Sequence, residues 1–187
     1  MTNFRKLLVG GALAVPMLMT LPVTAGATTV ESVDFKTLIH KADACVVGSV
    51  ADTRTETVDG QVYTVTDFTV SDVAFGDVGG MVSVRTPGGA VTRSMFPVSE
   101  VVPGAPRFLS GQEYFLLLDD APSLAPGYSD IGATDGFVPA GVFEGALPMI
   151  GGRVNLPGLG SGLDAESALD IVTEERAAPT AVVGETE

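Results

Sequence analysis

An Asp59-Gly60 dipeptide between two β-patterned runs is the feature that most restricts how this chain can fold. Asp-Gly flanked by alternating apolar residues is the strongest short signal for a tight β-hairpin, because the turn needs positive φ angles. Residues 44–55 before it are rich in valine and threonine and predict a strand. Residues 62–75 after it then form the antiparallel partner, so we expect the fold to be built on one long hairpin.

The second arm of this hairpin changes its apolar face part-way along. Along this arm one face is formed by even-numbered residues, and the apolar pattern then moves to the odd-numbered Val73 and Phe75. The even-numbered residues are Val62, Thr64, Thr66, Phe68 and Val70. A change of phase inside a long strand predicts a β-bulge, here near Ser71 and Asp72. Gly48 in the first arm predicts a second bulge or a close backbone approach. Long, bulged and bent strands favour closure into a small barrel.

Further strands are expected downstream. Residues 81–86 alternate as a half-buried strand that ends at Pro87-Gly88-Gly89, and residues 90–95 are expected to return as a short hairpin arm. The run 114–118 is apolar throughout, which is typical of a strand buried on both faces. Prolines and glycines in residues 121–163 leave room only for short strands such as 136–138 and 152–155, and the glycines at 158–162 indicate a flexible linker.

Two short helices are expected to flank the strands. The apolar spacing of Val33, Leu38 and Ile39 suits a helix near the start, with Ser32 as its cap and Asp34 in its first turn. A second helix is expected from a cap at Asp164 to residue 176. Residues 28–176 are thus expected to form a single, mainly β domain, and residues 177–187 a flexible acidic tail.

The first 27 residues have the pattern of a secretory signal peptide. Arg5 and Lys6 precede an apolar stretch, residues 7–21, and the small residues 25–27 then match what signal peptidase accepts. We expect cleavage after Ala27, a periplasmic or secreted protein, and no stable membrane insertion after cleavage. An uncleaved interfacial anchor is the alternative.

The charge of the chain restricts its partners. The net charge is −13, so electrostatic repulsion argues against nucleic acid and anionic membrane surfaces. We interpret the acidity as a means of solubility in salt, in preference to cation binding. The one cysteine, Cys45, cannot form an internal disulfide, and its apolar neighbours predict a small buried hydrophobic residue. A reactive or intermolecular thiol is the alternative.

Searches for reactive motifs give no candidate catalytic residue. The G-x-S-x-G motif of serine hydrolases is absent, because no serine has a glycine both two positions before it and two positions after it. The sequence also has no phosphate-binding loop with a lysine, and no pair of cysteines or histidines that could bind zinc. We therefore predict no metal and no cofactor. Carboxylates are too abundant in this chain to be informative, so a hydrolase that uses carboxylates alone stays open.

A binding site is predicted where two arginines lie beside tight turns, and its residues are Arg85, Thr86, Gly88, Gly89 and Arg107. In so acidic a chain, such a cluster is suited to an anionic group or to the carboxylate of a partner. The alternative is that the arginines form ion pairs with nearby acids and that the glycines only turn the chain.

The order of these motifs resembles a known group of domains. The motifs are ADACVVGSV (42–50), the strand 63–75 with Gly76, VSVRTPGG (82–89), PRF (106–108) and GQEYFLLL (111–118). They are similar to uncharacterised exported bacterial domains and, more distantly, to the netrin-like domains of tissue metalloproteinase inhibitors. The resemblance implies an OB-like barrel, here of five to seven strands with short N- and C-terminal helices. Such inhibitors reach the protease zinc with an amino-terminal cysteine and carry several disulfides, which this chain lacks.

These observations predict an exported, non-catalytic binding module whose partner is another exported protein. One alternative is an inhibitor or accessory protein of an extracellular hydrolase that uses residues 87–108 as a wedge. The other is the carboxylate-only hydrolase.

Overall fold

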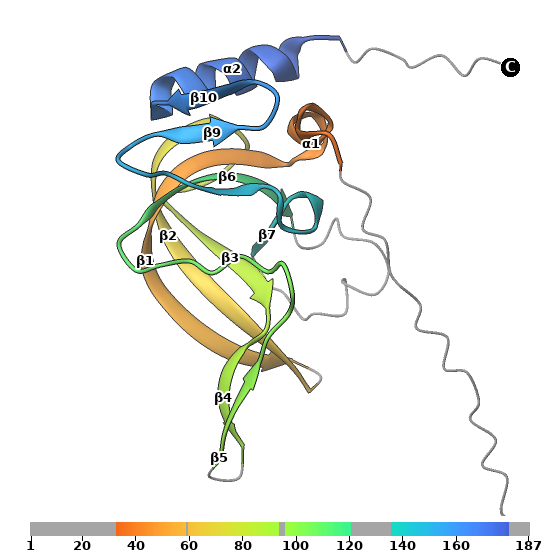
Figure 1. Ribbon diagram of the computed structural model, residues 1–187, viewed down its shortest axis with the longest axis vertical. Helices are drawn as coiled ribbons and strands as arrows, with labels where there is room; N and C mark the ends of the chain where they lie inside the picture. The colour runs from red at the N-terminus through yellow and green to blue at the C-terminus, as the bar shows by residue number, and fades with distance from the viewer. Residues whose placement is uncertain (1–32, 59, 94–95, 121–135, 180–187) are drawn as a thin grey trace, which may run out of the picture. The chain divides into compact units, whose positions relative to one another are not determined.

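The computed structural model describes residues 33–58, 60–93, 96–120 and 136–179 (Figure 1). The expected signal peptide, the cap Ser32 and residues 180–187 of the expected tail lie outside these residues. In chain order the elements are α1 (Phe35–Lys41), β1 (Ala44–Val58), β2 (Gln61–Phe75), β3 (Met81–Pro87), β4 (Gly89–Arg93), β5 (Phe96–Glu100), β6 (Glu113–Asp120), β7 (Phe137–Pro139), a short 3-10 helix η2 (Gly141–Phe143), β8 (Ala146–Pro148), β9 (Val154–Leu156), β10 (Gly160–Leu163) and α2 (Ala165–Ala177).

Five of the strands form a closed ring. The order is β1-β2-β3-β7-β6, and β6 pairs with β1 to complete the circle. Only the β3–β7 contact is parallel among these pairs, and β8 adds to the free edge of β6. The structure is therefore a small, mainly β, OB-like barrel with a short helix at each end of the chain, as the sequence predicted.

The core has two layers because several strands are buried on both faces. Inside the ring lie Val46, Phe68, Val84, Leu116 and their neighbours. The outer layer packs α1 and α2 onto the other face of β1 and β6 and includes Cys45, Val47, Phe115, Leu117, Ile39 and Val172. The prediction that residues 114–118 are buried on both faces is confirmed.

Cys45 belongs to the outer layer and has no exposed surface. Burial raises the pKa of its thiol far above the usual range, so the reactive thiolate is strongly disfavoured. The interpretation of Cys45 as a small buried hydrophobic residue is confirmed.

Both predicted irregularities in the long hairpin are present. Val47 pairs with Asp72 and Gly48 with Val70, so Ser71 is the extra residue of a bulge. The Ser71 hydroxyl donates to the carbonyl of Val47 at 3.1 Å. A Cβ on Gly48 would lie 2.9 Å from the backbone oxygen of Thr69, so the strands approach too closely there for a side chain.

Polar contacts stabilise the start of α2 and join its end to α1. Asp164 caps α2 as predicted and accepts a hydrogen bond from the Ser167 amide at 2.9 Å. Near the other end, the Arg176 guanidinium donates to the carbonyls of Ile39 and Ala42 at 2.8 and 2.7 Å, which joins α2 to α1. At α1, Asp34 occupies the N-cap position instead of the predicted first turn, and no capping hydrogen bond is made by its side chain.

Two segments differ from the predictions. The glycines at 158–162 do not form a linker, because β10 pairs with β9 in a small hairpin. Residues 90–95 were expected to return as a short hairpin arm after the strand 81–86, yet β4 pairs with the strand that follows it, β5, in a second hairpin (Figure 1). In both segments the partner strand begins a few residues after the first strand. A short connection rich in turn residues lets the two strands pair as a hairpin.

Neither helix in the described part of the chain is long and apolar enough to cross a membrane.

Replacing Gly60 with valine should destabilise the protein by about 1 kcal/mol or more, since a β-branched residue is strained at positive φ. The φ of Gly60 is +84°, and no atom lies within 4 Å of the position of an added Cβ, so the cost arises from the backbone alone. Chemical denaturation measures this change. Gly79→Val is the matched control, because Gly79 also has open space but no positive φ. Equal stability of the two variants would contradict the turn assignment.

Candidate binding pocket at the open end of the barrel

The barrel interior changes from apolar to hydroxyl-bearing at one end. On β2 the inward positions run Phe68, Thr66, Thr64, and on β3 they run Val84, Thr86. Thr64 is paired with Thr86, and Thr66 with Thr53 of β1, so the threonines are neighbours across three strands. Because side chains alternate along a strand, residues 64–68 (T-x-T-x-F) place two threonines and one phenylalanine on the same inner face. The threonines form a polar wall next to the apolar core.

This wall belongs to a pocket of about 260 Å³, which we name the mouth pocket. The residues that line it are Thr53, Thr64, Thr66, Thr86, Pro87, Gly88, Gly89, Ala90, Ser99, Glu100, Val101, Val102, Ala105, Pro106, Arg107 and Phe108. One side is thus the β1–β2–β3 sheet, and the other is the end of β5 with residues 101–108.

An aromatic cluster fixes the second side of the pocket to the core. The Phe108 ring meets Phe68 and Tyr114 edge to face, with centroids 4.9 and 5.0 Å apart. The Tyr114 hydroxyl accepts from the Leu109 amide at 3.0 Å and donates to the Arg107 carbonyl at 3.4 Å. Residues 107–109 are therefore held in place, and with them the position at which the Arg107 side chain leaves the backbone.

Gly88 and Gly89 let the chain pass from β3 into β4 across the inner face of the sheet. Gly88 has a φ of +91°, and a Cβ there would lie 2.8 Å from the Glu100 carbonyl oxygen. A Cβ on Gly89 would lie 2.8 Å from the Thr64 hydroxyl oxygen. The Gly88 amide donates to the Val62 carbonyl at 2.7 Å, so it is not available to a ligand.

The hydroxyls of the wall are unequally satisfied. Thr64 donates to the Gly88 carbonyl at 2.8 Å, and Thr86 makes a long contact of 3.4 Å with the Thr64 carbonyl. Thr66 has no exposed surface, and its hydroxyl has no hydrogen-bond partner among the described residues. A buried hydroxyl left unpaired costs about 1–3 kcal/mol, so this position is expensive for the folded protein.

The structure brings four of the five predicted site residues together. Thr86, Gly88, Gly89 and Arg107 all line the mouth pocket. Arg85 does not, because neighbouring residues on a strand point to opposite faces of the sheet. The hydroxyl residues Thr53, Thr64, Thr66 and Ser99 were not predicted as site residues, although the alternation of residues 62–70 already places Thr64 and Thr66 on one face of the strand.

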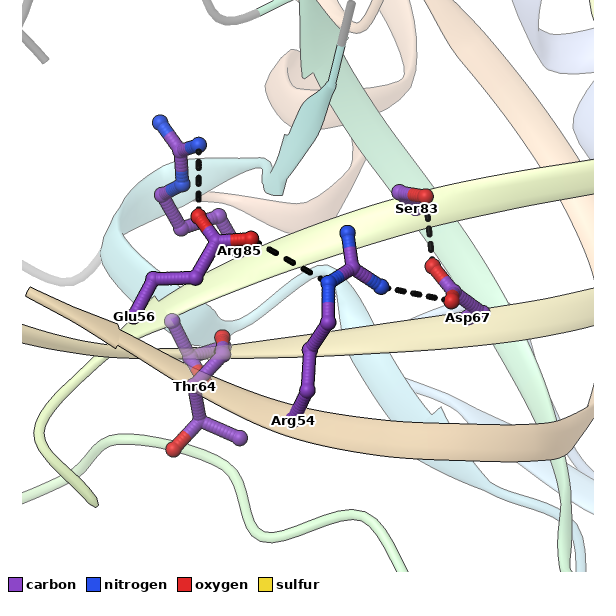
Figure 2. A network of polar contacts seen from close by, with 7 residues as sticks. Arg54, Glu56, Thr64, Asp67, Ser83 and Arg85 are labelled. Atoms are coloured by element: carbon purple, nitrogen blue, oxygen red, sulfur yellow. Dashed lines mark hydrogen bonds and ion pairs between the residues drawn. The ribbon is translucent and has the colours of Figure 1, made fainter. Parts of the chain in front are cut away.

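Arg85 instead joins a polar network on the outer face of β1, β2 and β3 (Figure 2). Its Nη2 atom lies 3.4 Å from Glu56, and Glu56 also accepts from Arg54 at 3.1 Å. Arg54 reaches Asp67 at 2.6 Å. A hydrogen bond from Ser83 and the contact with Arg54 lower the pKa of Asp67, which keeps that carboxylate charged. Arg85 therefore forms an ion pair with Glu56, which was the alternative considered for the two arginines.

Arg107 and Glu100 are the charged residues of the mouth pocket, and both are exposed. Arg107 makes no ion pair with any described residue, unlike Arg54, Arg85 and Lys36. The described residues of the pocket therefore present one cation, one carboxylate and the hydroxyl residues Thr53 and Ser99 to solvent, whereas Thr66 and Thr86 are buried in its wall.

The described carboxyl groups do not form an acid–base pair in this pocket, since Glu100 is the only acid among the lining residues that the structure describes. Burial raises the pKa of Asp119 to about 6, with a further contribution from Asp43, but Asp119 does not line the mouth pocket. Among the described residues, no group of three or more histidine, cysteine, aspartate or glutamate side chains is arranged to hold a metal ion.

No protein-family model, no curated protein and no solved structure matches this chain.

Asp119→Asn should stabilise the protein more at pH 7 than at pH 4. The pKa of Asp119 is about 6 in the folded protein, against an ordinary value of 3.8, so the folded state binds more protons between these two values. Stability contributed by the wild-type residue therefore falls as the pH rises through this window. Because the side chain is only about half buried, the gain should be small and should shrink in salt.

The difference in melting temperature between variant and wild type, followed from pH 4 to pH 7, measures this effect. A difference that stays constant over this range would show that Asp119 titrates normally.

Proposed function

We propose that the protein is an exported, non-catalytic binding module that takes its ligand in the mouth pocket. The observation that carries this proposal is the buried, unpartnered hydroxyl of Thr66 in the wall of an open pocket. Valine has nearly the same shape as threonine and would avoid the cost of an unpaired hydroxyl. A threonine there is explained if the hydroxyl has a partner when a ligand is bound.

The location of the pocket supports the same conclusion. OB-like barrels commonly bind ligands over their second and third strands, and β2 and β3 supply Thr64, Thr66 and Thr86. This support is an analogy at the level of the fold, since such barrels carry many functions. The export part of the proposal depends on the signal-peptide pattern of residues 1–27.

A thermal-shift panel tests the proposal. The probes are glycerol and monosaccharides, amino acids and dipeptides, small monocarboxylates, and inorganic phosphate and sulfate. A ligand present at about 100 times its Kd stabilises by about 2.7 kcal/mol, which raises Tm by about 5–10 °C for a domain of this size. We expect at least one class of probe to stabilise the wild type.

Thr66→Val is the decisive variant. We expect its unliganded form to be as stable as the wild type or about 1 kcal/mol more stable, because the unpaired hydroxyl is removed, and we expect the ligand-induced shift to be lost. Thr69→Val is the matched control, since Thr69 is exposed on the opposite face of the same strand. The proposal fails if no probe stabilises the wild type, or if Thr66→Val responds as the wild type does.

A second candidate function is favoured by the β4–β5 hairpin, which extends away from the ring in Figure 1. Phe96 and Val98 on it are 72% and 40% exposed. An apolar projecting arm suits an inhibitor or accessory protein of an extracellular hydrolase, in which this hairpin acts as a wedge in the cleft of the enzyme.

Titration of purified extracellular proteases and glycosidases tests this second function. The wild type should change the activity of at least one enzyme, and Phe96→Ser should weaken that effect at least tenfold. Ile150→Ser is the control, because Ile150 is 76% exposed on a turn outside the hairpin. Flat titrations across the panel would remove this candidate.

A further inference from the structure

We infer that the mouth pocket recognises a small group with one carboxylate next to a hydroxyl or an amide. Such a group is found in a free α-hydroxy acid and at the carboxyl end of a polypeptide. The inference rests on the proposed function, and it specifies the chemistry of the ligand.

The charge of the pocket points to a single carboxylate. The exposed Arg107 guanidinium has no ion pair within the described part of the chain, and its backbone is fixed by the Tyr114 hydroxyl and Phe108. A guanidinium binds a carboxylate through two parallel hydrogen bonds. The net charge of −13 and the nearby Glu100 oppose a ligand with more than one negative charge, so a monoanion fits better than phosphate.

The backbone of the turn also argues against phosphate. Phosphate sites usually have several free amides that point to one spot. The Gly88 amide is already bonded to Val62, and Arg107 is the only cation among the described residues that line the pocket. The glycines therefore shape the pocket and do not supply an anion cradle.

The threonine wall provides the second half of the recognition. The Thr64 hydroxyl uses its proton on the Gly88 carbonyl, so its oxygen is left as an acceptor. The Thr66 hydroxyl has both a proton and lone pairs without partners. A ligand hydroxyl or amide that donates to one threonine and accepts from the other complements this pair, whereas a purely apolar group does not.

The size of the pocket limits how much of a ligand it encloses. A volume of about 260 Å³ is just below the roughly 300–1,000 Å³ of sites that hold drug-sized ligands. A hydroxy acid or the last residue of a peptide fits this space, and its hydrocarbon part can contact Pro106, Val102 and the Phe108 ring. A sugar ring without a carboxylate would leave Arg107 unused and would find only one aromatic side chain in the wall.

Nuclear magnetic resonance titration of the mature protein tests the inference with two matched pairs of probes. The first pair is L-lactate and lactamide, and the second is N-acetyl-Ala-Ala and its C-terminal amide. Each pair differs in the carboxylate alone. The methyl signals of Thr66 and Thr86 report binding in the pocket, and the shifts give Kd.

We expect each carboxylate to bind at least tenfold more tightly than its amide, and the difference to shrink as salt is added. Arg107→Gln should remove this difference. Arg54→Gln should keep it, because it removes the same charge from an exposed ion pair on the outer face. The tighter of the two carboxylates shows whether a free hydroxy acid or a chain end is preferred.

Equal binding of acids and amides, or an unchanged preference in Arg107→Gln, would overturn the inference and leave the mouth pocket as a binding site of other specificity. Failure of all four probes to bind also overturns it. The proposed function is judged separately, by the response of wild type and Thr66→Val to the wider panel.

Discussion

Strand β1 is the element on which the ring depends, because it pairs with β2 along one edge and with β6 along the other. The pairing with β6 extends only from Ala44 to Ser49, whereas the pairing with β2 continues to Val58. The last backbone hydrogen bonds between β1 and the segment before β6 join Val50 to Gln112 and Gly111. Beyond Val50 the β1–β2–β3 sheet continues without β6 opposite it, and the mouth pocket lies on the inner face of this extension. The pocket is therefore a direct result of strands of unequal length.

Much of this architecture could be predicted because the relevant signals are local. The Asp-Gly turn, the change of phase near Ser71 and the apolar run of β6 each follow from one short segment. Strands β4 and β9 were expected, as residues 90–95 and 152–155, but their partners β5 and β10 were not predicted, because these strands are short and contain residues that also occur in loops. Such strands form when a neighbouring segment is held close by, which no short window of sequence reveals.

The candidate site was predicted in part for a similar reason. Composition drew attention to two arginines in an acidic chain, but the alternation along β3 separates Arg85 from Thr86 and places them on opposite faces. The same alternation on β2 puts Thr64 and Thr66 beside Thr86, a relationship that the strand pattern contained. The period of two applies to polar residues as it does to apolar ones, and it places the threonines on the inner face and Arg85 on the outer face. The position of residues 101–108 opposite them depends on Phe108 and Tyr114, and that contact is tertiary.

The two faces of the same sheet use polar residues differently. On the outer face, Arg54, Glu56 and Asp67 satisfy one another, and exposed pairs of this kind add little stability. Arg85 on the same face is satisfied only in part, because its Nε and Nη1 atoms are buried without a hydrogen-bond partner among the described residues. On the inner face, the Thr66 hydroxyl is buried without a partner in the described part of the chain, and an unpaired buried hydroxyl lowers the stability of the unliganded protein. A fold selected for stability alone would place its paired polar groups where they are buried and its unpaired ones in water. The reverse arrangement at the mouth pocket is what a binding site requires, because the groups that recognise a ligand must have no partner until it arrives.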